Sequence, residues 1–304
     1  MALTINTNMS SMLVQSNLSK ATTALNKAIE RMTTGYKINH ASDNAAGYSI
    51  ARNWEARLGS LDVAADNAAT GADMLSTLED HYSLISQHIQ RVRDLTEQAA
   101  NGTYGSQSLK AINSEIKARL QEVDRIAENC EFGGQRMMVG KLQGLAIQVG
   151  IDGDSDRSQI TLNNSLFKSG MVKDLFGAEI GQATTATDKD VAVQEVANLC
   201  SGYDVGQKKK TSTNASDMLV KLDKVINEIS TRVTTLGAAQ NRIESAITSI
   251  GVQAENITSS LSTLRDADVA TESSNYIKAQ ILQQASATLL STANQTPSIA
   301  LNLL

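Results

Sequence analysis

Histidine side chains are the commonest ligands of catalytic metals, so their spacing is the first test of whether this chain could do chemistry. Its three histidines are His40, His81 and His88. A zinc peptidase needs two histidines one helical turn apart with a glutamate beside the first. His81 and His88 are instead seven residues apart, on one helix face with no further ligand close in sequence. The spacing therefore predicts no metal site.

Two other groups of reactive side chains also fall short of a site. Asp152, Asp154 and Asp156 alternate as in a calcium loop, but the bidentate glutamate that closes such a loop is replaced by Asn163. Cys130 and Cys200 are the only cysteines; they are either ordinary small apolar residues or the halves of one disulfide. No Cys–His pair and no phosphate-binding glycine loop occurs. We expect no catalytic residues, no cofactor and no enzyme.

The composition favours long helices. Among 304 residues there is one proline, Pro297, and aromatic residues make up 3% of a chain that is 41% hydrophobic. Proline interrupts helices, so its near absence leaves long helices possible. The net charge of −5 argues against nucleic acid as a partner. The sequence has no apolar stretch long enough to predict membrane insertion. The amino terminus lacks the pattern of a cleaved signal peptide.

Apolar residues recur every three or four positions on both sides of the chain's centre. Two such series are Leu58, Leu61, Ala65, Ala68, Ala72 and Leu75, and Leu219, Leu222, Ile226, Ile229, Val233 and Leu236. A mean spacing of about 3.5 residues is typical of coiled-coil packing. The pattern predicts one helix over 217–264 and a shorter one over 108–128. The turn sequence at 101–105 would make the shorter helix antiparallel to the one before it.

The centre of the chain has a different texture. Residues 133–206 contain eleven of the nineteen glycines, so strands and turns are expected there. Leu145 and Ile147 alternate with polar or small neighbours, as do Ile160 and Leu162, which predicts a β-hairpin. Residues 188–200 are expected to form one short amphipathic helix.

The two ends of the chain are amphipathic but short, so isolated helices made from them would be marginal in water. Residues 1–60 carry a net charge of +3 and residues 255–304 a net charge of −2, which favours their pairing. Such ends would gain order by burying their apolar faces against other helices on assembly. The residues expected to be buried in this way are Leu18, Leu25 and Met32, against partners such as Ile277, Ile281 and Leu289.

Several segments closely resemble the signatures of bacterial flagellins. They are LNKAIERMTTGYKIN at 25–39, DNAAG at 43–47, QRVRDL at 90–95, ANGT at 100–103, FGGQR at 132–136, LGAAQNR at 236–242, DAD at 266–268 and AQILQQA at 279–285. They occur in the order and spacing of that family and cover roughly 1–163 and 215–304. A hook–filament junction protein, which has related terminal helices, is the alternative within this class. A soluble coiled-coil signalling protein is the alternative outside it, although it would lack the paired terminal signatures.

The resemblance implies a mainly α fold: a long antiparallel helical bundle, or rod, with a small β-hairpin region and paired terminal helices. Residues 1–40 and 265–304 would form the two halves of a filament-core coiled coil. Residues 41–163, with the hairpin, and 214–264 would form the helical rod, and 164–213 a short variable outer segment. The implied function is that of a structural subunit which polymerises with itself into the flagellar filament for motility.

The resemblance also implies partners and a location. The chain would leave the cell through the flagellar type III export apparatus without a cleaved signal, held beforehand by an export chaperone. It would end in the extracellular filament, in contact with filament cap and junction proteins. A vertebrate Toll-like receptor that senses flagellin would contact Gln90, Arg91, Leu95 and Glu115. Alternatively, Leu95 belongs to the bundle core, and Arg91 and Glu115 are solvated or subunit-contact charges.

Overall fold

A computed structural model of the chain describes residues 8–180, 189–201 and 212–301. The chain divides into two compact units, one made of Met1–Gly59 and Gln253–Leu304 and the other of Ser60–Val252. Helix α2 (Ala45–Ala100) and helix α7 (Ser212–Arg265) each contribute to both units. In the part of the chain that is described, no helix has the length and apolarity needed to cross a membrane. The long helices and small antiparallel sheets confirm the predicted fold class.

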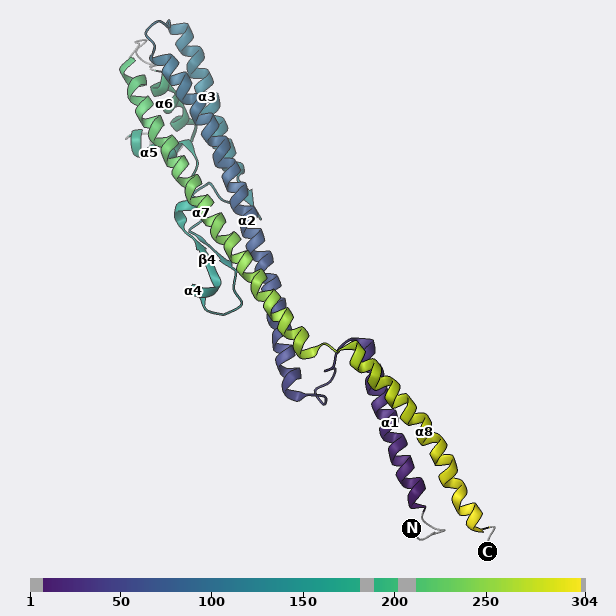
Figure 1. Cartoon of the computed structure of the whole chain (residues 1–304). Coiled ribbons are helices and arrows are strands. Elements are labelled where there is room, and N and C mark those ends of the chain that lie inside the picture. Colours follow the sequence, from purple (N-terminus) through teal and green to yellow (C-terminus); the bar gives the residue numbers. More distant parts are fainter. Residues whose placement is uncertain (1–7, 181–188, 202–211, 302–304) are drawn as a thin grey trace. The chain divides into compact units, whose positions relative to one another are not determined.

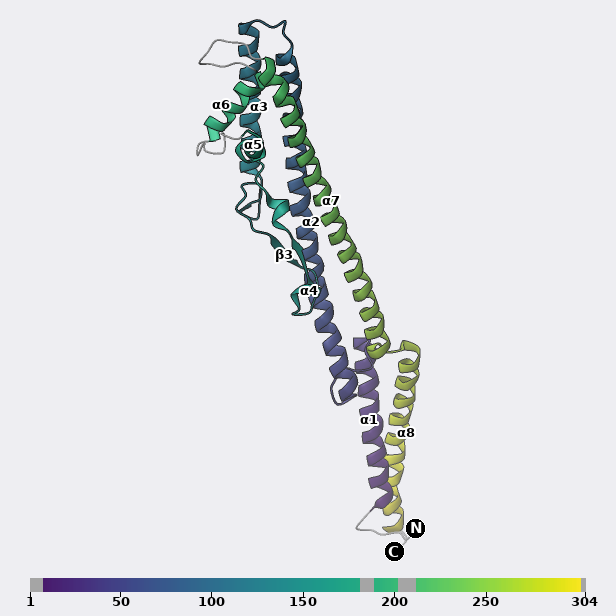
Figure 2. The ribbon, with the colours of Figure 1, turned by 90° about the vertical axis from the view of Figure 1, so that its left-hand side faces the viewer.

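The first unit is built on helices α1 (Met9–Thr34) and α8 (Val269–Leu301), which lie side by side in both views (Figures 1 and 2). They run antiparallel, since Arg31 bonds to Glu272 near one end and Asn8 bonds to the Ala293 carbonyl near the other. The Asn8 side chain also caps α1 by accepting the Ser11 amide. Gly35 ends α1 at φ 74°, a left-handed conformation that favours glycine.

The second unit is a helical bundle in which α2, α3 (Ser106–Asn129) and α7 share one core. Fully buried side chains follow the apolar stripes of the sequence; they include Leu75, Leu78, Tyr82, Ile85, Ile89, Ile116, Leu120, Leu222 and Leu236. Helices α7 and α3 confirm the predicted helices over 217–264 and 108–128. The residues between α2 and α3 form the expected turn, and the two helices lie side by side in Figures 1 and 2.

Two small hairpins follow α3. The first pairs β1 (Glu131–Phe132) with β2 (Gln135–Arg136), and the second pairs β3 (Leu145–Gln148) with β4 (Gln159–Leu162). The second is the predicted hairpin, with Ile147 opposite Ile160 and a short helix α4 (Ser155–Ser158) in its loop. Gly71 of α2 lets this hairpin approach, because a Cβ at that position would overlap the Ile147 side chain.

The prediction of strands and turns across 133–206 is partly wrong. A 3₁₀ turn η1 (Asn164–Phe167) and helix α5 (Val172–Ile180) occupy part of this segment where no helix was expected, whereas helix α6 (Lys189–Ser201) was expected. Glycine content misled the prediction, because Phe167 and Phe176 are fully buried in the bundle core and hold the segment against it. Helix α6 matches the helix expected over 188–200. Residues 181–188 and 202–206 lie outside the described residues.

Helices α5 and α6 lie beside α3 (Figure 2), and polar bonds join them to it. The Asp124 carboxylate accepts the Val172 amide at 2.7 Å, at the start of α5. The Asn113 amide donates to Asn198 at 3.0 Å and to Ser201 at 2.7 Å, both on α6. Because buried polar groups must be paired, these bonds select one position for each helix on α3.

Both cysteines are free and fully buried, Cys130 after α3 and Cys200 in α6. The structure therefore has the small apolar residues of the first interpretation and no disulfide. Burial raises the pKa of each thiol to about 12. Since the thiolate is the reactive form, both side chains are inert while the bundle is closed.

Candidate assembly surface

Most of the fully buried residues between α1 and α8 have small side chains. Ala21 and Ala28 are the buried residues of α1, seven positions apart, and on α8 Ala279 and Ser286 repeat the same spacing. A heptad spacing keeps one face of a helix toward its neighbour. Small residues on that face let the two backbones approach closely and leave little room for larger ones. These residues define what we call the small-residue seam.

Many of the larger apolar side chains of the two helices are exposed. Those that are exposed are Met9, Met12, Leu13, Ile29 and Met32 on α1 and Val269, Ile277, Ile281, Leu282 and Leu289 on α8. Monomeric proteins rarely expose apolar residues in such density, and extended apolar patches mark association surfaces. Full burial of each such side chain stabilises by about 1.5–3 kcal/mol. The exposed faces of α1 and α8 therefore have the character of an interface between chains.

The residues predicted for self-assembly lie mainly in this exposed set. Met32 is 41% exposed, and Ile277, Ile281 and Leu289 are 53%, 58% and 57% exposed. Leu18 and Leu25 are half-buried. In the single chain none of these six residues is fully buried. Their burial between chains stays a prediction.

Backbone contacts join the loop between α1 and α2 to the connection between α7 and α8. Tyr36 pairs with Asp266 in an isolated antiparallel bridge, and the Lys37 amide donates to the Arg265 carbonyl at 2.7 Å. The Arg265 guanidinium lies 4.0 Å from the Tyr36 ring centre and forms an ion pair with Glu55. The cation–π contact and the ion pair join the end of α7 to the loop after α1 and to α2. Sequence reasoning missed this network, although the DAD motif at 266–268 marks its place.

An acidic side chain organises the loop after α1. Asp43 binds the Lys27 ammonium at 2.6 Å and accepts the backbone amides of Asn39 and His40 at 3.2 Å. The Lys27 bond is the main cause that lowers the pKa of Asp43 to about 2, so this carboxylate stays charged at neutral pH. It lies within the DNAAG motif, whose chemical role the sequence alone did not reveal.

The residues predicted for receptor contact come together on α2 and α3 of the second unit. The Arg91 guanidinium binds Glu115 at 3.0 Å across the two helices, and both side chains are exposed. Gln90 is exposed beside them. Leu95 is only 2% exposed and belongs to the bundle core. Three of the four residues thus lie on the surface, and the fourth lies beneath it.

His88 lies one turn before this group and gives α2 a pH-sensitive contact with α3. Burial lowers the pKa of His88, helped by Arg119 and Arg125 and opposed by Glu122. At pH values between its lowered folded-state pKa and the ordinary value of about 6.5, such a histidine is neutral in the fold but protonated in the unfolded chain. Its stabilising contribution is present above pH ~6.5 and is lost as the pH falls toward the folded-state pKa.

We therefore expect His88→Gln to reduce the loss of thermal stability as the pH falls below about 6.5. The measurement is the midpoint of thermal unfolding against pH, by circular dichroism. His40→Gln is the matched control, because His40 is exposed and pairs with Glu30 in the other unit. Identical pH profiles for His88→Gln and the unaltered chain would contradict the assignment.

Comparison with known proteins identifies the same two regions. The family model described as the bacterial flagellin N-terminal helical region matches residues 5–143, and that described as the C-terminal helical region matches 219–304. The chain is 36% identical over 313 residues to a flagellin of Xenorhabdus nematophila and 36% identical over 353 residues to one of Serratia marcescens. In both comparisons the whole of each protein is covered.

Solved structures of similar proteins share less. The crystal structure of Bacillus cereus flagellin is 22% identical, with a TM-score of 0.45, and the match covers 64% of this chain and 94% of that one. Because the family matches together span well over half of the chain, and full-length relatives exceed 30% identity, the assignment rests on sequence. This chain belongs to the bacterial flagellin family, whose members are structural subunits of the flagellar filament and not enzymes.

Proposed function

We propose that copies of this chain polymerise through the exposed apolar faces of α1 and α8. The proposal rests on one observation: in that unit small residues are buried between the two helices, while many large apolar residues remain exposed. A surface that meets a different surface on the next copy, without closing a ring, generates a helical filament. Leu18, Leu25, Met32, Ile277, Ile281 and Leu289 would become buried between copies.

In this proposal the parts of the chain have separate tasks. Residues 1–40 and 265–304 form the core of the filament, and 41–163 with 214–264 form the helical layer around it. Residues 164–213 form a short outer segment. The breaks between α1 and α2 and between α7 and α8 support the boundaries near 40 and 265, because regular helix stops at both places.

The proposal extends to how the chain reaches the filament. As in the family, it would pass through the type III export apparatus without a cleaved signal, after binding a chaperone. It would then meet the cap and junction proteins outside the cell. The exposed aliphatic residues of α1 and α8 support a chaperone requirement, because such faces would otherwise associate prematurely.

Seeded polymerisation tests the function directly. The purified full-length chain is mixed with short filament fragments and observed by electron microscopy, with an unseeded sample as control. We expect long filaments that grow from the seeds. If the chain binds to the ends of the seeds but does not elongate them, the junction-protein alternative is favoured. A chain that stays monomeric at every concentration would contradict the proposal.

We further propose that the exposed surface around Arg91 is recognised by the flagellin-sensing Toll-like receptor. Gln90, Arg91 and Glu115 would make the contact, while Leu95 would hold α2 in place beneath it. The support is that Arg91 and Glu115 are exposed and joined across two helices, which presents a preorganised charged pair to a partner.

Charge reversal at Arg91 is the corresponding test. We expect Arg91→Asp to weaken receptor signalling by about tenfold or more, since a charged hydrogen bond at an interface contributes about 1.5–3 kcal/mol. The measurement is the half-maximal dose in receptor-expressing reporter cells. Arg93→Asp is the matched control, because Arg93 pairs with Asp223 on α7.

A charge swap separates recognition from folding. Arg91→Asp combined with Glu115→Arg restores an ion pair between α2 and α3 but reverses its polarity. If the double variant signals normally, the pair serves only the bundle and the receptor proposal fails. We expect signalling to stay low while the thermal stability returns toward that of the unaltered chain.

A further inference from the structure

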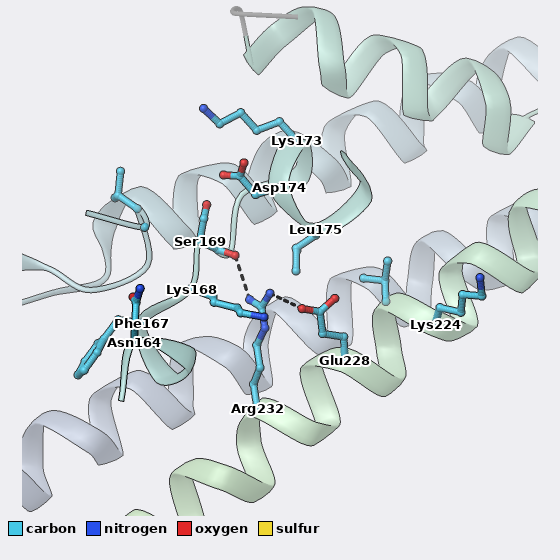
Figure 3. Close-up of a pocket in the computed structure, with 13 residues that line it drawn as sticks. Asn164, Phe167, Lys168, Ser169, Lys173, Asp174, Leu175, Lys224, Glu228 and Arg232 are labelled. Atoms are coloured by element: carbon cyan, nitrogen blue, oxygen red, sulfur yellow. Dashed lines mark hydrogen bonds and ion pairs between the residues drawn. The ribbon is translucent and has the colours of Figure 1, made fainter. Parts of the chain in front are cut away.

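A basic pocket of about 640 Å³ opens in the second unit, between α7 and the segment that leads into α5 (Figure 3). Four cationic side chains and two acidic ones line it: Lys168, Lys173, Lys224, Arg232, Asp174 and Glu228. The cations come from three different segments of the chain. Four basic side chains against two acidic ones leave the lining with an excess of positive charge, which favours an anionic ligand. Polymerisation, as proposed above, gives this pocket no role.

Arg232 is the most deeply placed of these cations. It is 7% exposed and extends from α7 toward the segment that carries Ser169, as Figure 3 shows. One terminal nitrogen donates to the Ser169 carbonyl at 2.9 Å and the other donates to Glu228 at 2.7 Å. Its Nε, although buried, has no hydrogen-bond partner. A buried donor without an acceptor costs free energy, and an anionic oxygen beside Arg232 would remove that cost.

Two of the lysines, unlike Arg232, form no ion pair among the described residues. In the ranges that the structure describes, no ion pair joins Lys168 or Lys173 to an acidic side chain, although Asp174 lies on the same wall. Glu228 is already bound to Arg232. The pocket therefore combines an unpartnered guanidinium N–H with lysine ammonium groups that are not neutralised.

We propose that this pocket binds a small oxoanion of the phosphate or sulfate type. Arg232 would hold one oxygen through Nε, and Lys168 and Lys173 would neutralise the others. A tetrahedral anion suits the pocket because its oxygens can accept hydrogen bonds from donors on different segments of the chain. The pocket is large enough to admit the ion with bound water, or a small molecule that carries such a group. A bound anion would fasten α5 and the segment before it to α7.

Titration of the full-length monomer with inorganic phosphate tests the proposal, by isothermal titration calorimetry at constant ionic strength. We expect one saturable site. Lys168→Gln and Lys173→Gln should each weaken binding by about tenfold, the loss expected for one charged hydrogen bond. Lys168 is exposed, so its replacement should not disturb folding. Lys117→Gln, on α3 and outside the pocket, is the matched control and should bind as the unaltered chain does.

Competition identifies the ion that the site prefers. Sulfate should displace phosphate from the unaltered chain with a single stoichiometric site, whereas chloride at equal ionic strength should not. Two results would overturn the proposal. One is the absence of saturable binding to the unaltered chain, and the other is equal phosphate affinity in Lys168→Gln, Lys173→Gln and Lys117→Gln.

Discussion

Deletion of residues 1–40 or of residues 265–304 is expected to abolish filament formation completely. Either deletion removes one partner of the small-residue seam, so the helix that remains has nothing to pair with in its own chain. An unpaired helix of this length is marginal in water and loses the geometry that presents its aliphatic residues. The measurement is the pelletable fraction after seeding, together with electron microscopy.

The helical bundle is the internal control for these deletions. The core of α2, α3 and α7 lies between residues 60 and 252, so circular dichroism should show that it remains helical and unfolds cooperatively. Filaments from either truncated chain would show that the terminal helices are dispensable. A truncated chain that failed to fold at all would be replaced by the point variant Ile281→Asp, which leaves the seam intact.

That point variant isolates the exposed face. Ile281 is 58% exposed in the single chain, so a charge there should not disturb the pairing of α1 with α8. Between copies the same charge would be buried without a partner, which is strongly unfavourable. We expect no filaments from Ile281→Asp, whereas Gln284→Asp, at an exposed polar position of α8, should still polymerise.

Replacing an alanine of the small-residue seam with a larger residue should strongly weaken the pairing of α1 with α8. Ala279 is 4% exposed against α1, and Ala279→Leu would place a larger side chain where two backbones already lie close. Overpacking of this kind typically costs about 1–3 kcal/mol. The pairing of two helices has little stability to lose, so we expect α1 and α8 to separate in the monomer.

Hydrogen exchange is the measurement for this second effect. Amides of α1 and α8 should lose protection in Ala279→Leu, while those of α2 and α3 in the bundle should not. The matched control is Ala285→Leu, because Ala285 is exposed on the same helix. Unchanged protection in Ala279→Leu would mean that α1 and α8 do not depend on close approach.

Most of the helical architecture could be predicted because it depends on local periodicity. The stripes through Leu75 and Leu222 specify which face of α2 and α7 is buried, whatever lies opposite. The hairpin around Ile147 and Ile160 was equally readable, since alternation is a local signal. Helix α5 was not predicted, because its position depends on Phe176 entering the core and on Asp124, far away in sequence, accepting its first amide.

The candidate surface was harder to predict, since periodicity does not say which of two apolar faces meets a partner in the same chain. Leu25 and Ala28 belong to one sequence stripe, yet the alanine is buried against α8 and the leucine is only half-buried. The Arg265–Tyr36 contact joins residues more than two hundred positions apart, and a single sequence holds no signal for such a pair. Motif resemblance marked the neighbourhood but not the contact.

The buried thiols of Cys130 and Cys200 can report local opening of the helical bundle. An alkylating reagent can reach them only when α3 and α6 move apart from the core, so its rate of reaction follows local opening and needs no engineered label. A filament and a free monomer could be compared in this way in one experiment. Slower alkylation in the filament would measure how much neighbouring copies tighten each bundle.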